Sequence, residues 1–220
     1  MLRNWKSSPG LAITALVAVT AVWGWTFLIV KDAISLMPVM DFLAVRFTLA
    51  ALIMFLLRPQ SLRHVSRRML WRGVILGILL GMGYITQTFG LRTVSPAVSG
   101  FITGMAVVFT PVLSCLLLRR NINRNTWIAV GLAIIGLALL SLHGWVFGTG
   151  ELLTLGCALF ITFHIIGLGE WSPHHDLYGL ALIQITTVAV ISLLAAAPPP
   201  GRPPSMPPER SSNHWSSRGP

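Results

Sequence analysis

The stretch from Met37 to Leu57, MPVMDFLAVRFTLAALIMFLL, decides how the rest of the chain can be arranged. It is apolar over a length that crosses a bilayer, yet it carries Arg46 well inside it. If the span begins near Val39, Arg46 lies about 10 Å deep, within the hydrocarbon layer. A cation there costs about 2.5 to 3.5 kcal/mol on insertion scales, so Arg46 is a candidate functional residue. The alternative is that its side chain only extends toward the nearer headgroups.

The composition indicates an integral membrane protein, because 54% of the 220 residues are hydrophobic and 10% are charged. A net charge of +10 could favour nucleic-acid binding in a soluble protein. Here most Lys and Arg residues lie in short segments between apolar runs, where they set membrane topology, so no nucleic-acid partner is expected. The two cysteines, Cys115 and Cys157, both lie in apolar runs, which predicts neither a disulfide framework nor a CxxC metal site.

Seven apolar runs are long enough to cross a bilayer, which predicts an all-α integral membrane protein with about seven transmembrane helices. They cover residues 11–30, 39–57, 73–91, 96–118, 126–142, 150–169 and 177–197. Small residues at close helical spacing predict tight helix packing at Gly77, Gly81, Gly83, Gly100 and Gly104.

The basic residues between the spans predict the orientation of the chain. Ten of them fall on one side, namely Arg3, Lys6, Arg58, Arg63, Arg67, Arg68, Arg72, Arg119, Arg120 and Arg124. Before the C-terminal tail, the other side holds only Lys31 and Arg92. Because cytoplasmic loops carry the excess of Lys and Arg, the N-terminus is predicted to be cytoplasmic.

Polar side chains in two other spans lie at a depth similar to that of Arg46. Tyr84 and Gln87 are near the outer end of span 73–91, while Ser99 and Thr103 lie four residues apart on one face of span 96–118. Two interpretations fit this polar stripe: hydrogen bonds between helices, or the wall of a substrate cavity.

Two further spans offer candidates for a substrate pathway. Trp23 lies four residues before Phe27 on one helical face, and Gly24 beside it leaves room for a close neighbour or a substrate. Lipid or packing contacts are the alternative for such aromatic residues. His164, in span 150–169, could relay protons or simply form a packed hydrogen bond. With no acidic residue or second histidine in the middle of a span, neither a metal site nor a proton-relay pair is expected.

In order and spacing, these features resemble the EamA-type permeases of the drug/metabolite transporter superfamily, over about residues 11–197. The resemblance rests on Trp23-Gly24, Phe27, Lys31, Pro38, Arg46-Phe47, Tyr84, Leu91, Ser95-Pro96-Ala97 and Pro111. It implies ten helices in two five-helix repeats of opposite orientation, with the substrate pathway between the repeats. Residues 1–145 would then form the first repeat and residues 146–197 the first two helices of the second.

The composition changes abruptly at Pro198, where residues 198–220 hold eight prolines and no Leu, Ile or Val. Such a composition predicts a disordered segment rather than a span. Since the second repeat stops after two helices, we expect this tail to be a frameshifted or otherwise aberrant terminus. The alternative is a genuine proline-rich tail outside the cytoplasm.

The sequence thus predicts a multi-pass inner-membrane permease whose partners are the lipid bilayer and a small polar metabolite, moved by alternating access. Arg46 favours an amino acid or related carboxylate, whereas no acidic residue at mid-span is present to hold a cationic drug. A non-transporting membrane fragment, which inserts and packs without forming a pathway, is the alternative. An intramembrane enzyme is not expected, because no paired nucleophile and base are visible, and no cofactor is expected.

Overall fold

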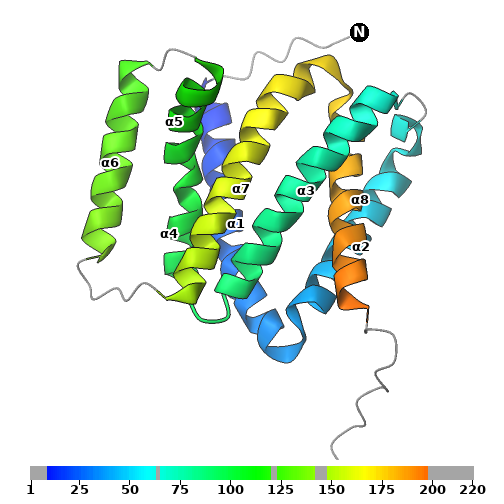
Figure 1. Cartoon of the computed structure of the whole chain (residues 1–220), viewed down its shortest axis with the longest axis horizontal. Helices are drawn as coiled ribbons and strands as arrows, with labels where there is room; N and C mark the ends of the chain where they lie inside the picture. Colours follow the sequence, from blue (N-terminus) through cyan, green and yellow to red (C-terminus); the bar gives the residue numbers. More distant parts are fainter. Residues whose placement is uncertain (1–8, 63–64, 120–122, 142–147, 198–220) are drawn as a thin grey trace, which may run out of the picture.

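The computed structural model describes residues 9–62, 65–119, 123–141 and 148–197, and these residues are all helical or in short connections (Figure 1). The all-α prediction is confirmed. The α-helices are α1 (Pro9–Leu36), α2 (Val39–Leu57), α3 (Arg67–Gly90), α4 (Pro96–Gly104), α5 (Ala106–Leu118), α6 (Arg124–Ser141), α7 (Thr149–Trp171) and α8 (Leu177–Ala196). Two short 3₁₀-helices, η1 (Pro59–Leu62) and η2 (Ser172–His174), precede α3 and α8.

Each predicted span falls on helix, but span 96–118 is divided at Met105 into α4 and α5. The turn tightens there, since the Met105 N–H donates to the carbonyl oxygen of Ile102, three residues earlier, at 3.0 Å. The neighbouring Gly104 has low helix propensity. Counting α4 and α5 as one stretch, the described residues contain six helical segments that are long and apolar enough to cross a membrane. Helix α6, over the predicted fifth span, is not among the six.

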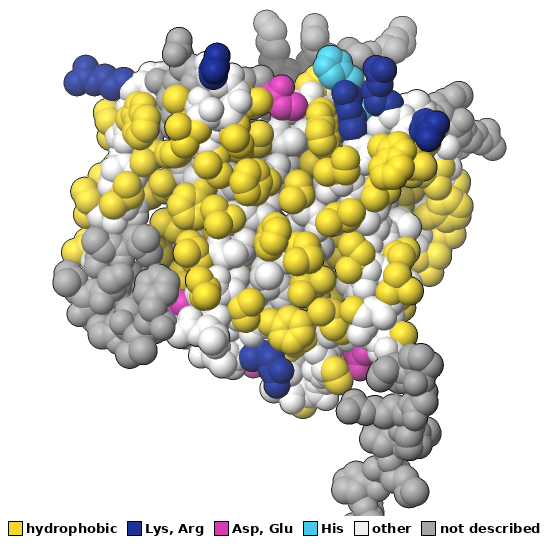
Figure 2. Space-filling view, viewed as in Figure 1, with side chains coloured by type: hydrophobic (Ala, Val, Ile, Leu, Met, Phe, Trp, Pro, Cys, Tyr) yellow, Lys and Arg dark blue, Asp and Glu magenta, His cyan; other side chains and the backbone are white. Residues whose placement is uncertain are grey.

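Successive long helices run in opposite directions, so their connections gather at two edges (Figure 1). The ends of α2 and α5 and the starts of α3 and α6 lie at the upper edge in that view. Most of the Lys and Arg side chains visible in Figure 2 lie along this edge, above a broad hydrophobic band. The structure thus puts the described basic connections on one side, while its assignment to the cytoplasm stays a prediction. Outside the described residues lie Arg3, Lys6, Arg63, Arg120 and the tail 198–220.

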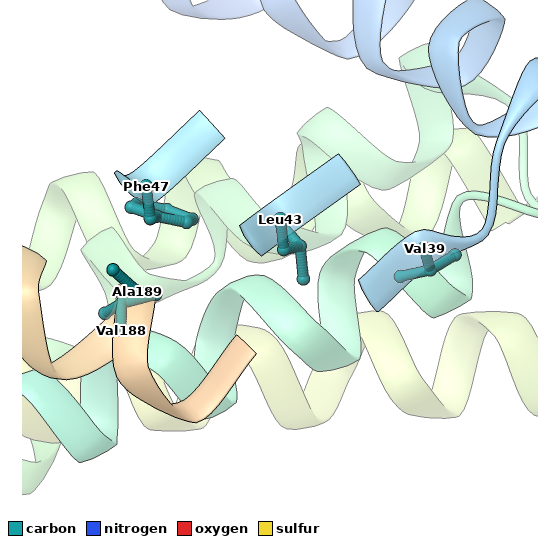
Figure 3. Close-up of a cluster of buried hydrophobic side chains, with 5 residues drawn as sticks. All are labelled: Val39, Leu43, Phe47, Val188 and Ala189. Carbon is teal, nitrogen blue, oxygen red and sulfur yellow. The ribbon is translucent and has the colours of Figure 1, made fainter. Parts of the chain in front are cut away.

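Helix α3 is central to the bundle, because it packs against both α7 and α8, and α2 lies along α8. Val39, Leu43 and Phe47 are spaced four residues apart and therefore share one face of α2. They form a buried cluster with Val188 and Ala189 of α8 (Figure 3). Residues far apart in the sequence thus make the core around which the remaining helices are placed.

Glycines let α3 approach its neighbours closely. A Cβ added at Gly77 would lie 2.6 Å from Thr187 Cβ and 2.9 Å from the Gln184 carbonyl oxygen in α8. At the other end of α3, a Cβ on Gly90 would lie 2.8 Å from the Gly150 carbonyl oxygen in α7. Gly81 and Gly83 also face neighbouring helices, as expected. The prediction of close packing at Gly104 is wrong. Among the described residues, a Cβ added there would meet no atom within 4 Å.

Helices α1 and α6 lie at the periphery. Most side chains of α1 are exposed, including Val17 at 63% and Trp25 at 66%, and its main contact is with α4. Helix α6 packs chiefly against α5. In a bilayer these apolar side chains face lipid or other protein, so exposure here does not indicate a water-facing surface.

Candidate functional site

Four of the predicted site residues line one small pocket between α1, α2 and α3. They are Trp23 of α1, Arg46 of α2, and Tyr84 and Gln87 of α3. The remaining lining residues are Thr26, Phe27, Val30, Thr88 and Leu91. The cavity volume of about 10 Å³ is about the room that one water molecule needs.

The half-buried Arg46 is held against aromatic rings. Its guanidinium carbon Cζ lies 5.4 Å from the centre of the Tyr84 ring and 5.6 Å from that of Phe47. The two rings pack edge to face with their centres 4.8 Å apart. Such cation–π contacts stabilise a cation by about 0.5 to 2 kcal/mol each. In the described part of the chain the one ion pair joins Arg58 and Asp176, so no described carboxylate neutralises Arg46.

Gln87 connects the pocket to the polar stripe on α4. Its side-chain Nε2 donates a hydrogen bond to Thr103 Oγ1 at 3.1 Å and lies 3.6 Å from Cys157 Sγ in α7. Ser99, one turn before Thr103, is fully buried, and its hydroxyl has no hydrogen-bond partner among the described residues. Thr103 therefore fits the interpretation of hydrogen bonding between helices, whereas Ser99 is a buried polar group without such a bond.

The structure does not bring Gly24 and His164 into this pocket. An added Cβ on Gly24 would meet no atom within 4 Å, so the close neighbour expected there is not among the described residues. His164 Nε2 lies 2.7 Å from Gln184 Oε1, which joins α7 to α8. This contact favours the interpretation of His164 as a packed hydrogen-bonding residue.

Several lining residues were not predicted as site residues. Thr26 and Thr88 each donate a hydroxyl hydrogen bond to a carbonyl of their own helix, at 2.6 and 2.7 Å, so these two hydroxyls are already paired. Phe27, which is 5% exposed, packs near Gly100 of α4. The sequence already placed Phe27 on the Trp23 face, one helical turn further on, although Phe27 was not among the predicted site residues.

Lys31, in the C-terminal part of α1, has a role in placing that helix. Its Nζ donates to the Val94 carbonyl oxygen at 2.6 Å, in the connection that leads into α4. This charge-assisted bond fixes one end of α1 near the pocket, although α1 has few other contacts.

Comparisons with known proteins agree on the family. The model of the EamA-like transporter family matches residues 10–142. A protein of Archaeoglobus fulgidus described as an uncharacterized transporter is 32% identical over 184 residues. That alignment covers 83% of this chain and 55% of the relative, so the chain spans about half the length of the curated relative it matches. No solved structure matches. The family is one of transporters rather than enzymes, and the resemblance seen in the sequence is confirmed: the chain belongs to the EamA-like transporter family.

Proposed function

We propose that this chain is, or is part of, a multi-pass inner-membrane permease that moves a small polar metabolite by alternating access. Family membership supports transport. The observation that carries the choice of substrate is Arg46, a cation that lines the pocket without a described carboxylate partner. A guanidinium binds a carboxylate through two parallel hydrogen bonds, which favours an amino acid or related carboxylate.

In this proposal the pocket widens when substrate enters, because its present volume accommodates about one water molecule. One wall consists of Trp23, Thr26, Phe27 and Val30 of α1. Of the three helices that line the pocket, α1 makes the fewest contacts, so its displacement disrupts less packing than that of α2 or α3. Arg46 then holds the anionic group, and the amide oxygen of Gln87, whose Nε2 donates to Thr103, is a further polar group in the wall.

The second candidate is a non-transporting fragment that inserts and packs without enclosing a pathway. The specific observation in its favour is that the chain spans 55% of the length of its relative. The EamA-type resemblance implies a pathway between two repeats, of which residues 146–197 would supply only two helices of the second.

Counterflow in proteoliposomes tests both candidates, because exchange of labelled for unlabelled substrate requires no knowledge of a coupling ion. The 220-residue chain is reconstituted, and a panel of radiolabelled amino acids and dicarboxylates is measured. Arg46→Gln removes the charge and Arg46→Lys removes the planar fork, and both should lower counterflow at least tenfold. Arg92→Gln is the matched control, since Arg92 is exposed and does not line the pocket.

The outcomes separate the candidates. A chain that is helical and monodisperse, yet shows no counterflow with any substrate, supports the fragment. If wild type exchanges a substrate and Arg46→Gln does so at the same rate, Arg46 only extends toward the headgroups, and the carboxylate proposal is wrong.

A further inference from the structure

A second group of basic side chains lies at the upper edge of the bundle, away from the Arg46 pocket. Ser66, Arg68 and Arg72, from the start of α3, face His174 and His175, which precede α8. Together they line an open pocket of about 530 Å³. No acidic side chain is among these lining residues, so the described wall of this pocket is basic.

An apolar pocket adjoins the basic one. It has a volume of about 510 Å³ and shares Arg68 and Arg72 with its neighbour. Its other lining residues are Arg67, Trp71, Ile75 and Trp171. Figure 2 shows His and basic side chains together at the upper edge, with hydrophobic side chains directly below them. The two pockets thus pass from a basic rim to an apolar wall.

Arg72 is positioned where the two pockets meet. Its Nη1 lies 3.1 Å from His175 Nε2, and its Cζ lies 5.7 Å from the centre of the Trp171 ring. The nearby carboxylate of Asp176 is engaged elsewhere. Its Oδ1 lies 3.7 Å from Arg58 Nη2, and its Oδ2 accepts the Gly179 N–H at 2.8 Å.

The charges at this end of α3 are opposite to those that a helix N-terminus prefers. The first turn contains Arg67 and Arg68 and no acidic residue. The helix dipole places partial positive charge at the same end, so the dipole and the two arginines repel each other. A bound anion would relieve this repulsion and also engage the guanidinium groups.

We propose that these two pockets bind one anionic phospholipid. Its phosphate lies against Arg68, Arg72 and the histidines, and an acyl chain lies along Trp71, Ile75 and Trp171. The apolar half of the site favours a lipid over a free phosphate, because a free phosphate has no apolar group to pack against that wall. Tryptophan at a membrane edge and basic pockets between helices are both typical of contacts with lipid headgroups.

Native mass spectrometry of the detergent-solubilised chain tests the proposal, with phosphatidylglycerol and phosphatidylcholine of identical acyl chains. Wild type should prefer phosphatidylglycerol. Arg68→Gln should weaken that preference about fivefold, and Arg68→Gln with Arg72→Gln about 25-fold, at roughly fivefold per arginine. Arg119→Gln with Arg124→Gln removes the same charge outside both pockets and should leave the preference intact. Circular dichroism confirms that each variant is folded.

Trp71→Ala distinguishes a lipid from a free anion. Trp71 is 60% exposed, so its loss disturbs the core little, but it should weaken phosphatidylglycerol binding severalfold. If Trp71→Ala has no effect and inorganic phosphate displaces the lipid, the pocket is a free-anion site and the phospholipid proposal is wrong. Equal losses in the site pair and the control pair would also overturn it, because the effect would then be one of net charge.

Discussion

At the scale of single residues, the position of Arg46 depends on the aromatic rings beside it. Tyr84→Leu removes one ring from the guanidinium, and we expect counterflow to fall about fivefold, as the loss of about 1 kcal/mol implies. Tyr84→Phe keeps the ring and should retain most of the activity. If Phe is as damaging as Leu, the hydroxyl group rather than the ring is what Arg46 or the substrate requires.

His175 provides a pH-dependent test at the opposite edge. Partial burial, followed by the charges of Arg72, His174 and Arg68, lowers the pKa of His175 below its ordinary value of 6.5. The folded state therefore binds fewer protons than the unfolded state in this range. The contribution of His175 to stability is full above pH 6.5 and is lost as the pH falls through the lowered pKa.

Histidine NMR titration of the chain in detergent measures this shift directly. Arg72→Gln should raise the pKa of His175 toward 6.5, whereas Arg119→Gln, outside the pocket, should leave it unchanged. A phosphatidylglycerol molecule in the basic pocket should also raise it, since its negative charge offsets the arginines. An unchanged pKa in Arg72→Gln would show that the charge of Arg72 does not contribute to the shift.

Sequence reasoning identified the pocket residues that are unusual for a span. Arg46 and Gln87 stand out because a charged or amide side chain in lipid must find a partner. It could not identify Cys157 as a neighbour of Gln87, because 70 residues separate them and only the packing of α3 on α7 brings them together. His164 is equally unusual, yet its partner is Gln184 rather than a substrate-lining residue.

At the scale of helices, Gly77 determines how closely α3 and α8 approach. A methyl group at Gly77 would meet both Thr187 and the backbone oxygen of Gln184. Unlike a flexible side chain, this backbone oxygen cannot rotate out of the way. We expect Gly77→Ala to lower the free energy of unfolding by about 1 to 3 kcal/mol, the usual cost of overpacking. Unfolding in a graded denaturant with helicity as the readout measures it.

Gly131→Ala in α6 is the matched control. An added Cβ there meets no atom within 4 Å, and alanine is the better helix former, so stability should be unchanged or slightly higher. Equal destabilisation by the two substitutions would mean that the α3–α8 contact is looser than the structure indicates.

Hydropathy predicted the helices well because each span must satisfy its backbone hydrogen bonds internally. It could not predict the division at Met105, where α4 ends in a tightened turn within one continuous apolar run. Nor could it distinguish Gly77, which contacts α8, from Gly104, which faces open space. Both glycines have the same local pattern, and only tertiary packing separates them.

At the scale of the whole molecule, the two edges should lie on opposite sides of the membrane. We predict that the edge carrying residues 58–72 is cytoplasmic. With Cys115 and Cys157 replaced by alanine, a cysteine at the exposed Gln60 should resist an impermeant maleimide in intact cells and react after permeabilisation. A cysteine at the exposed Asp32, on the other edge, should react in intact cells. The reverse labelling pattern would invert the orientation.

The pairing of α2 with α8 has a consequence for biosynthesis. Roughly 120 residues separate the two helices, so at 5 to 20 residues per second α8 is synthesised about 6 to 24 s after α2. Throughout that interval Leu43 and Phe47 have no α8 to pack against, although as apolar side chains they are well tolerated by lipid. Arg46 is without its contact to the Tyr84 ring for a shorter time, because α3 is the next long helix to be synthesised after α2. A ribosome that stalls before residue 177 therefore leaves the buried face of α2, and Gly77 of α3, without the helix that covers them.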